Sequence, residues 1–434
     1  MILRILHAAE LSESETRALM IRESAADTAA VDLVSEIISN VERGGAGAVR
    51  AYNEKFDGVT RTDLVVSPEE FDRAESKLSD DLKRAFQAAA NNIRAFHELQ
   101  KQSLEGREAR ICGASLGYRY VPVGVAGVYV PGGKASYPSS VLMGVLPAIV
   151  AGVPEIVLIT PPAPDGSVDE AVLYCARLAG AQRVLRAGGA HGIAAAALGV
   201  EVPQAQVIVG PGNRYVTAAK SLLAARGLIR MDLPAGPSEV VVIADETARA
   251  EFVAADMLSQ AEHGHDSPAV LLTTSVDFAR SVGEHIERGL QERPARREMK
   301  ETSIRDHSFA LVFEDLAQAF AFSNEYAPEH LEICTRDPRA DLERITAAGS
   351  VFLGNYAPVA LGDYFSGTNH VLPTGGAARF YSGLGVETFL KRITYQFPDR
   401  ESLATALEPI TLMSRHEGFE HEHGHSVAVR FEES

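Results

Sequence analysis

A glutamine and a histidine stand three residues apart in the segment 259–264, at the end of a predicted helix. This i, i+3 spacing places Gln260 and His263 on one face of the helix, where both can point at one metal ion. Taken alone, a Gln-x-x-His sequence before Gly264 is more often a simple helix end. A metal site therefore requires further ligands from elsewhere in the chain.

A carboxylate and an imidazole are adjacent in the segment 324–331, directly after a proline. Imidazole titrates near neutral pH and a neighbouring carboxylate can raise its basicity, so Glu329 and His330 form a plausible acid/base pair. The alternative is a surface loop in which both residues cover the strand that follows.

The segment 361–370 is dense in Gly, Asn and Asp and follows a predicted strand. Such loops carry the binding groups of α/β sheets, so Asp363 could supply an oxygen ligand. The alternative is that Asp363 and Asn369 only hold the loop through Asx turns.

Four of the thirteen histidines lie between His416 and His425, interleaved with glutamates. One of them could bind a metal, or the segment could be solvated, and spacing does not choose between these. If Gln260, His263, Asp363 and one tail histidine converge, the ligands are two nitrogens and two oxygens. Such a set suits zinc acting as a Lewis acid, with manganese or cobalt as replacements.

Three glycine-rich turns, at 130–134, 187–191 and 209–213, follow predicted strands and precede predicted helices. Their backbone N–H groups could hold phosphates at helix N-termini. The first strand–helix turn lacks a Gly-x-Gly-x-x-Gly sequence, so these turns alone indicate a nucleotide only weakly.

Composition excludes several classes of protein. The formal charge of −17 argues against nucleic acid as a partner. The three cysteines are far apart, which excludes a thiolate zinc knuckle and a disulfide framework. We find no signal-peptide pattern and no long unbroken apolar run, so we expect a cytoplasmic protein with no membrane partner.

The hydrophobic pattern predicts the elements that position these residues. It is helical from residue 16 to about 104, and short β-branched runs then alternate with helices, as in βαβ units. The predicted strands are 127–130, 155–160, 183–187 and 206–209, then 239–244, 269–273, 310–313, 331–335 and 350–353. After about Gly383 the strand signal fades, and we expect only helices and the histidine-rich tail.

We therefore predict an α/β protein with two Rossmann-like αβα domains and mainly parallel sheets. A helical N-terminal region precedes them and a C-terminal helical tail follows. The predicted boundaries are 1–110, 111–236, 237–381 and 382–434, with the join between the two domains near 235–237.

Six blocks of sequence together resemble the histidinol dehydrogenase family, from the N-terminal helices to the tail. These blocks are residues 129–140, 209–213, 235–239, 259–264, 324–331 and 362–374. The resemblance implies zinc bound by Gln260, His263 and Asp363, and by the tail histidine seven residues before Arg430, which is His423. It also implies a homodimer in which each tail crosses to the other subunit and completes a shared site.

The resemblance further implies an NAD-dependent oxidation of L-histidinol through the aldehyde to L-histidine, with two NAD and one water. Tyr129 and Asn213 would border the NAD. Zinc would hold the amine and imidazole of the substrate. His330 would take the hydroxyl proton, and Glu329 would activate the water that hydrates the aldehyde. The residues implied in substrate binding are Ser238, His330, Glu417 and the four zinc ligands.

Two positions depart from the family pattern. His191 stands beside the expected cofactor site where we expect a glutamine, and one extra residue separates Glu417 from His423, which leaves His421 as an alternative ligand. The segment 264–268 is similar to relatives that oxidise other small alcohols, such as sulfopropanediol. The hypotheses are thus a histidinol enzyme, the same chemistry on another alcohol, and a non-catalytic protein that binds zinc through its tail.

Overall fold

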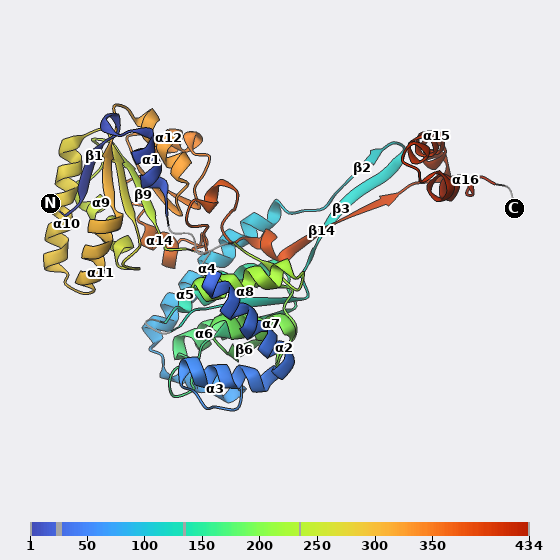
Figure 1. Cartoon of the computed structure of the whole chain (residues 1–434), viewed down its shortest axis with the longest axis horizontal. Helices are drawn as coiled ribbons and strands as arrows, with labels where there is room; N and C mark the ends of the chain where they lie inside the picture. The colour runs from blue at the N-terminus through green and yellow to red at the C-terminus, as the bar shows by residue number, and fades with distance from the viewer. Residues whose placement is uncertain (1, 23–27, 133–135, 234–235, 433–434) are drawn as a thin grey trace. The chain divides into compact units, whose positions relative to one another are not determined.

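The structure is a computed structural model that describes residues 2–22, 28–132, 136–233 and 236–432. Its contacts divide the chain into two units (Figure 1). The first contains Met1–Leu99 and Val123–Phe389, and the second contains Gln100–Pro122 and Leu390–Ser434. Gly133 and Lys134 of the first predicted turn, and Ala235 at the predicted join, lie outside the described residues.

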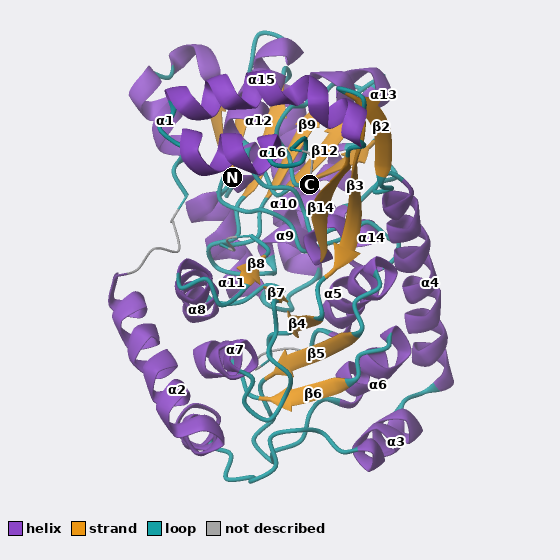
Figure 2. Cartoon of the chain, turned by 90° about the vertical axis from the view of Figure 1, so that its right-hand side faces the viewer, coloured by secondary structure: helices purple, strands orange, loops and turns teal. Residues whose placement is uncertain are grey.

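The first sheet of the first unit is parallel throughout, in the order β6-β5-β4-β7-β8. Its central strands are continuous buried apolar runs, which is typical of parallel sheets covered on both faces. Helices α7, α8 and α2 lie on one side, and α5, α6 and α3 on the other (Figure 2). The strands are β4 Val125–Tyr129, β5 Glu155–Thr160, β6 Arg183–Arg186, β7 Val207–Val209 and β8 Arg230–Met231. The helices are α2 Thr28–Asp57, α3 Pro68–Lys77, α5 Pro138–Ala151, α6 Glu170–Ala179, α7 Gly189–Leu198 and α8 Arg214–Ala225.

The second sheet is also parallel, in the order β1-β11-β10-β9-β12-β13. Apolar side chains of α9 and α10 pack on one face, and those of α12 and α1 pack on the other. The strands are β9 Val240–Ala244, β10 Ala269–Thr273, β11 Phe309–Val312, β12 His330–Cys334 and β13 Ser350–Leu353. The helices are α1 Glu13–Met20, α9 Ala250–Ala261, α10 Val276–Glu292, α11 Arg297–Thr302, α12 Leu316–Tyr326, α13 Pro338–Asp341 and α14 Val359–Tyr364. The predicted class, with two α/β domains and parallel sheets, is confirmed.

The N-terminal region is not purely helical. Its first strand, β1 (Arg4–His7), pairs with β11 at the edge of the second sheet, where Figure 1 shows it in blue. Four residues are too few for a sequence periodicity to reveal a strand. The helices that follow are α1, α2, α3 and α4 (Asp80–Gln102), and α2 is broken at Gly45, whose φ is +52°. This glycine therefore interrupts the long predicted helical stretch.

The second unit contains an antiparallel sheet that our expectation of an entirely helical C-terminal region missed. Its order is β14-β3-β2, with Thr394 of β14 opposite Tyr118 of β3. The strands are β2 Arg107–Ile111, β3 Ala114–Pro122 and β14 Leu390–Phe397, and helices α15 (Arg400–His416) and α16 (His425–Ala428) follow. All residues of β14 after Leu390 are exposed, so the strand lacks the buried pattern on which the prediction depended.

The four predicted segment boundaries stay predictions. The contacts group residues 100–122 with 390–434 because β14 pairs with β3. Within the described ranges, no helix has both the length and the apolar character needed to cross a membrane.

Candidate active site

The acid/base pair lies at the start of β12. Helix α12 ends at Tyr326, and Ala327 takes a left-handed conformation (φ +53°) that turns the chain into β12. Glu329 and His330 are both buried, which rules out the surface loop that we had weighed as the alternative. They stand beside Ser238 and Glu239, which precede β9, so the pair is held at the amino ends of two neighbouring parallel strands.

Glu329 has two hydrogen-bond donors. Its Oε2 accepts from the Ser238 hydroxyl at 2.6 Å and from the Glu239 backbone N–H at 2.9 Å. Burial raises the pKa of Glu329 to about 8, although both hydrogen bonds act in the opposite direction. A carboxylate with such a pKa is a much stronger base than an exposed one.

His330 is held in one tautomer. Its Nδ1 lies 3.0 Å from the Glu239 backbone oxygen, and a carbonyl can only accept, so Nδ1 carries the proton. Burial lowers the pKa of His330, which keeps the ring neutral. The other nitrogen, Nε2, is buried without a partner and lies 3.8 Å from Asp363 Oδ1. His330 thus presents a free lone pair, as a general base requires.

Gln260 occupies the last turn of α9 and is buried, yet neither its oxygen nor its nitrogen has a hydrogen-bond partner. A buried amide without partners costs free energy unless a ligand satisfies it. His263 follows within one turn. The amide oxygen, an imidazole and the Asp363 carboxylate are donors that zinc accepts, so these residues fit such an ion.

Asp363 belongs to α14, and His370 orients it. His370 Nδ1 donates to the Asp363 backbone oxygen at 2.9 Å, and its Nε2 lies 3.1 Å from the Ser140 hydroxyl. Asn369 does make the Asx-type bond that we considered, to the Val371 N–H at 2.9 Å. The turn-forming role therefore belongs to Asn369, and the Asp363 carboxylate is left for another function.

A cavity of about 430 Å³, here called the dyad cavity, brings these groups together. Among its lining residues are Ser238, His263, Glu329, His330, Asp363 and His370. Over the described ranges, no three His, Cys, Asp or Glu side chains alone are arranged to hold a metal. The unsatisfied Gln260 amide would have to complete the set.

Tyr129, Asn213 and His191 lie together at a second cavity of about 560 Å³, here called the turn cavity. It lies at the carboxyl ends of β4 and β6 and beside the turn after β7, where the strand order of the first sheet reverses. Such switch points are the usual ligand sites of doubly wound sheets. Gly210 illustrates the close packing there: its φ is +113°, and a Cβ would lie 2.1 Å from the Tyr129 backbone oxygen.

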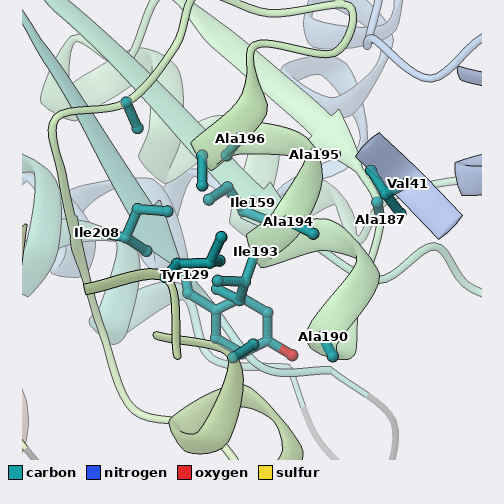
Figure 3. Packing of buried hydrophobic residues seen from close by; sticks show 14 of the residues in the cluster. Val41, Tyr129, Ile159, Ala187, Ala190, Ile193, Ala194, Ala195, Ala196 and Ile208 are labelled. Carbon is teal, nitrogen blue, oxygen red and sulfur yellow. The ribbon is translucent and has the colours of Figure 1, made fainter. Parts of the chain in front are cut away.

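The three side chains are fixed differently. Figure 3 shows the Tyr129 ring packed in the apolar cluster with its oxygen on the side of Ala190, and this oxygen accepts from the Gly189 N–H at 3.2 Å. Burial raises the pKa of Tyr129 to about 12, so the hydroxyl stays protonated. Asn213 caps α8 through its side-chain oxygen, which accepts from Tyr215 N at 3.0 Å. Its amide nitrogen is not used in the cap.

Glu417 and His423 belong to the second unit, which is described by itself. Both are exposed, and the His423 ring lies 5.3 Å from that of Phe419. Their assignment to a site stays a prediction, as does the choice between His423 and His421.

Several residues of the site were missed from the sequence. Ser140 and His370 lie inside the recognised blocks, but nothing in their spacing shows that they support Asp363. Glu239 binds both members of the acid/base pair through its backbone N–H and carbonyl groups. Because any residue type has these groups, the sequence does not reveal this role.

Two adjoining cavities, one with a buried carboxylate and imidazole and the other at a sheet switch point, define a two-domain α/β enzyme. The sequence model of the histidinol dehydrogenase family matches residues 20–431, and the chain belongs to this family. This membership excludes the non-catalytic hypothesis.

Individual relatives agree. The chain is 49% identical over 410 residues to a histidinol dehydrogenase of Leptospira interrogans, with 94% of each chain covered. It is 45% identical over 426 residues to one of Halobacterium salinarum, with 98% of each chain covered. The crystal structure of histidinol dehydrogenase from Elizabethkingia anophelis matches with a TM-score of 0.92 and 39% identity, over 99% of this chain and 98% of that one.

Proposed function

We propose that the protein oxidises L-histidinol through L-histidinal to L-histidine, using two NAD and one water. The observation that carries this proposal is the neutral His330, whose free Nε2 lies 3.8 Å from Asp363 Oδ1. Family membership supplies the substrate, and no relative found favours sulfopropanediol. The cytoplasmic location remains a prediction.

Gln260, His263 and Asp363 would hold the zinc ion, with His423 as the fourth ligand. When bound, zinc supplies a Lewis acid that binds the amine and imidazole of the substrate. The unsatisfied amide of Gln260 supports this assignment.

The remaining steps belong to the side chains of the chain itself. His330 Nε2 accepts the hydroxyl proton as hydride leaves the carbinol carbon. Glu329 then takes a proton from water as the resulting hydroxide adds to the aldehyde, and protonated His330 returns its proton to the alkoxide that forms. The product is a second carbinol, and His330 is neutral again and can accept the hydroxyl proton of the second oxidation. Ser238 donates its only proton to Glu329, so towards the substrate it can act only as an acceptor. Because His330 accepts the hydroxyl proton in both oxidations, one site can perform both.

A homodimer would cover the second unit. Ile393, Tyr395 and Phe397 of β14 are exposed, as are Leu412 and Met413 of α15. Apolar side chains gathered on such small elements are typical of interfaces. If the tail crosses between subunits, mixing His423→Ala chains with Gln260→Ala chains restores part of the activity. Verified mixed dimers without activity would contradict the exchange.

The assay that tests the proposed function compares NADH formation from L-histidinol and from dihydroxypropanesulfonate at equal enzyme concentration. We expect L-histidinol to be oxidised and the sulfonate not to be, and chelation of the metal to abolish the signal. Preference for the sulfonate would overturn the substrate assignment but leave the mechanism in place.

A further inference from the structure

The turn cavity has an end that is remote from the acid/base pair. It shares Pro131 and Asn213 with the dyad cavity, so the two cavities adjoin at these residues. If NAD is the cofactor, as the proposed function requires, its nicotinamide must reach the dyad cavity to receive hydride. The adenosine half then extends into the turn cavity, past the shared residues.

The remote end of the turn cavity has apolar walls. Leu33 and Ile37 of α2 line it, together with Phe56. The Phe56 ring is stacked on Tyr52 at a centroid distance of 5.5 Å and is 49% exposed. An exposed, braced aromatic ring is a surface on which a flat purine can stack.

His191 places a hydrogen-bond acceptor at this end. The Asn53 amide nitrogen donates to the Arg186 backbone oxygen at 2.7 Å, so its Oδ1 faces His191 Nε2, 2.8 Å away. That oxygen can only accept, so Nε2 carries the proton and Nδ1 has the lone pair. Nδ1 is buried without a partner in a side chain that is 2% exposed. It faces the Gly189 turn, 3.8 Å from where a Cβ of Gly189 would stand.

Asp57 supplies a second acceptor. Its Oδ2 has no hydrogen-bond partner and lies 4.0 Å from His191 Nε2, whose proton is already donated to Asn53. Among the described residues that line the turn cavity there is no lysine or arginine. Lys55 lies over the Phe56 ring, 5.3 Å from its centroid, and is not a lining residue.

We propose that Asp57 and Nδ1 of His191 bind the hydroxyl groups of the adenosine ribose, and that Asp57 thereby selects NAD over NADP. Two acceptors without donors suit a diol, which brings two donors. A 2′-phosphate would instead place about two negative charges beside a carboxylate, with no cation among the described lining residues to offset them. Asp57 and His191 are thus specificity residues for the cofactor.

The test is calorimetric titration of the metal-loaded full-length protein with NAD, NADP, ADP-ribose and 2′-phospho-ADP-ribose. The last two lack only the nicotinamide base, so they report on binding without a contribution from the reacting ring. We expect the parent to prefer NAD by about 100-fold and Asp57→Asn to reduce this preference to about 10-fold or less. Glu54→Gln is the matched control, because it removes an exposed charge from the same helix without touching the cavity.

His191 is tested in the same way. His191→Gln retains an acceptor and should keep ADP-ribose binding within about threefold, whereas His191→Leu should lose about tenfold. A preference for NAD that is unchanged in Asp57→Asn overturns the role of Asp57. Equal binding by the Leu and Gln variants overturns that of His191. If the parent binds neither NAD nor ADP-ribose, both this inference and the proposed function fall.

Discussion

Replacing Ser238 by alanine should shift the acidic limb of the pH–rate profile of the second oxidation to higher pH. The Ser238 hydroxyl is one of the two hydrogen-bond donors to Glu329, and it lowers the pKa of that carboxyl. A hydrogen bond to a charged group contributes about 1.5–3 kcal/mol, and one pKa unit corresponds to about 1.4 kcal/mol. Loss of the bond therefore raises the pKa of Glu329 by about 1–2 units.

The sign of the effect on rate follows from the role of Glu329 as a base. In the parent its pKa is about 8, so half of the carboxyl groups are ionised at that pH. After the shift only about 1–10% are ionised there, and the rate at pH 8 falls by about 5- to 50-fold. Raising the pH restores it.

The assay is the pH profile of kcat/KM with L-histidinal as substrate, which isolates the second oxidation. Ser238→Thr keeps a hydroxyl and is the matched control. Because a bound cation lowers the pKa of a nearby carboxyl, all variants are compared at equal metal content. An acidic limb that stays at the parental pH in Ser238→Ala would refute the assignment of Glu329 as the base.

Three further predictions concern stability and metal binding. Gln260→Leu should abolish metal binding. It should also raise the free energy of unfolding of the metal-free protein by about 1–2 kcal/mol, because a buried amide without partners is removed. A lower free energy of unfolding in urea titrations would contradict this. Glu70→Ala leaves the buried Arg186 guanidinium without its closest partner and should lower the free energy of unfolding by about 3 kcal/mol. The control Glu75→Ala, at an exposed position, should change the free energy of unfolding little. Burial lowers the pKa of His191 from 6.5 to about 4. The neutral ring therefore makes its full contribution to the free energy of unfolding above pH 6.5, and this contribution is lost as the pH falls towards 4. This loss amounts to about 3 kcal/mol, and His191→Gln should remove that part of the acid dependence in urea titrations at several pH values.

The fold was predictable where burial is complete. The strands at 155–160 and 269–273 have the predicted ends, because buried apolar runs bounded by turns mark them clearly. The strand at 350–353 also has the predicted ends, although it lies at a sheet edge and only Phe352 in it is buried. The missed strands are those at edges or on exposed sheets. Arg4–His7 is a short edge strand and Leu390–Phe397 is almost wholly exposed, so neither has a pattern that separates it from a loop.

The site was predictable as a set of chemical groups but not as a network. Local spacing and the resemblance identified Gln260, His263, Glu329, His330 and Asp363, and four of the five line one cavity. What fixes their protonation is a set of bonds to backbone atoms, such as that from His330 to the Glu239 carbonyl. These bonds depend on strand register between β9 and β12, which no local sequence pattern encodes.

The central claim is that one site performs two successive oxidations. The most direct test is to let a limiting, known amount of L-histidinol react to completion with excess NAD and to count the NADH formed. We predict two NADH for each L-histidinol, with L-histidine as the product. One NADH for each L-histidinol, with accumulation of the aldehyde, would contradict the account.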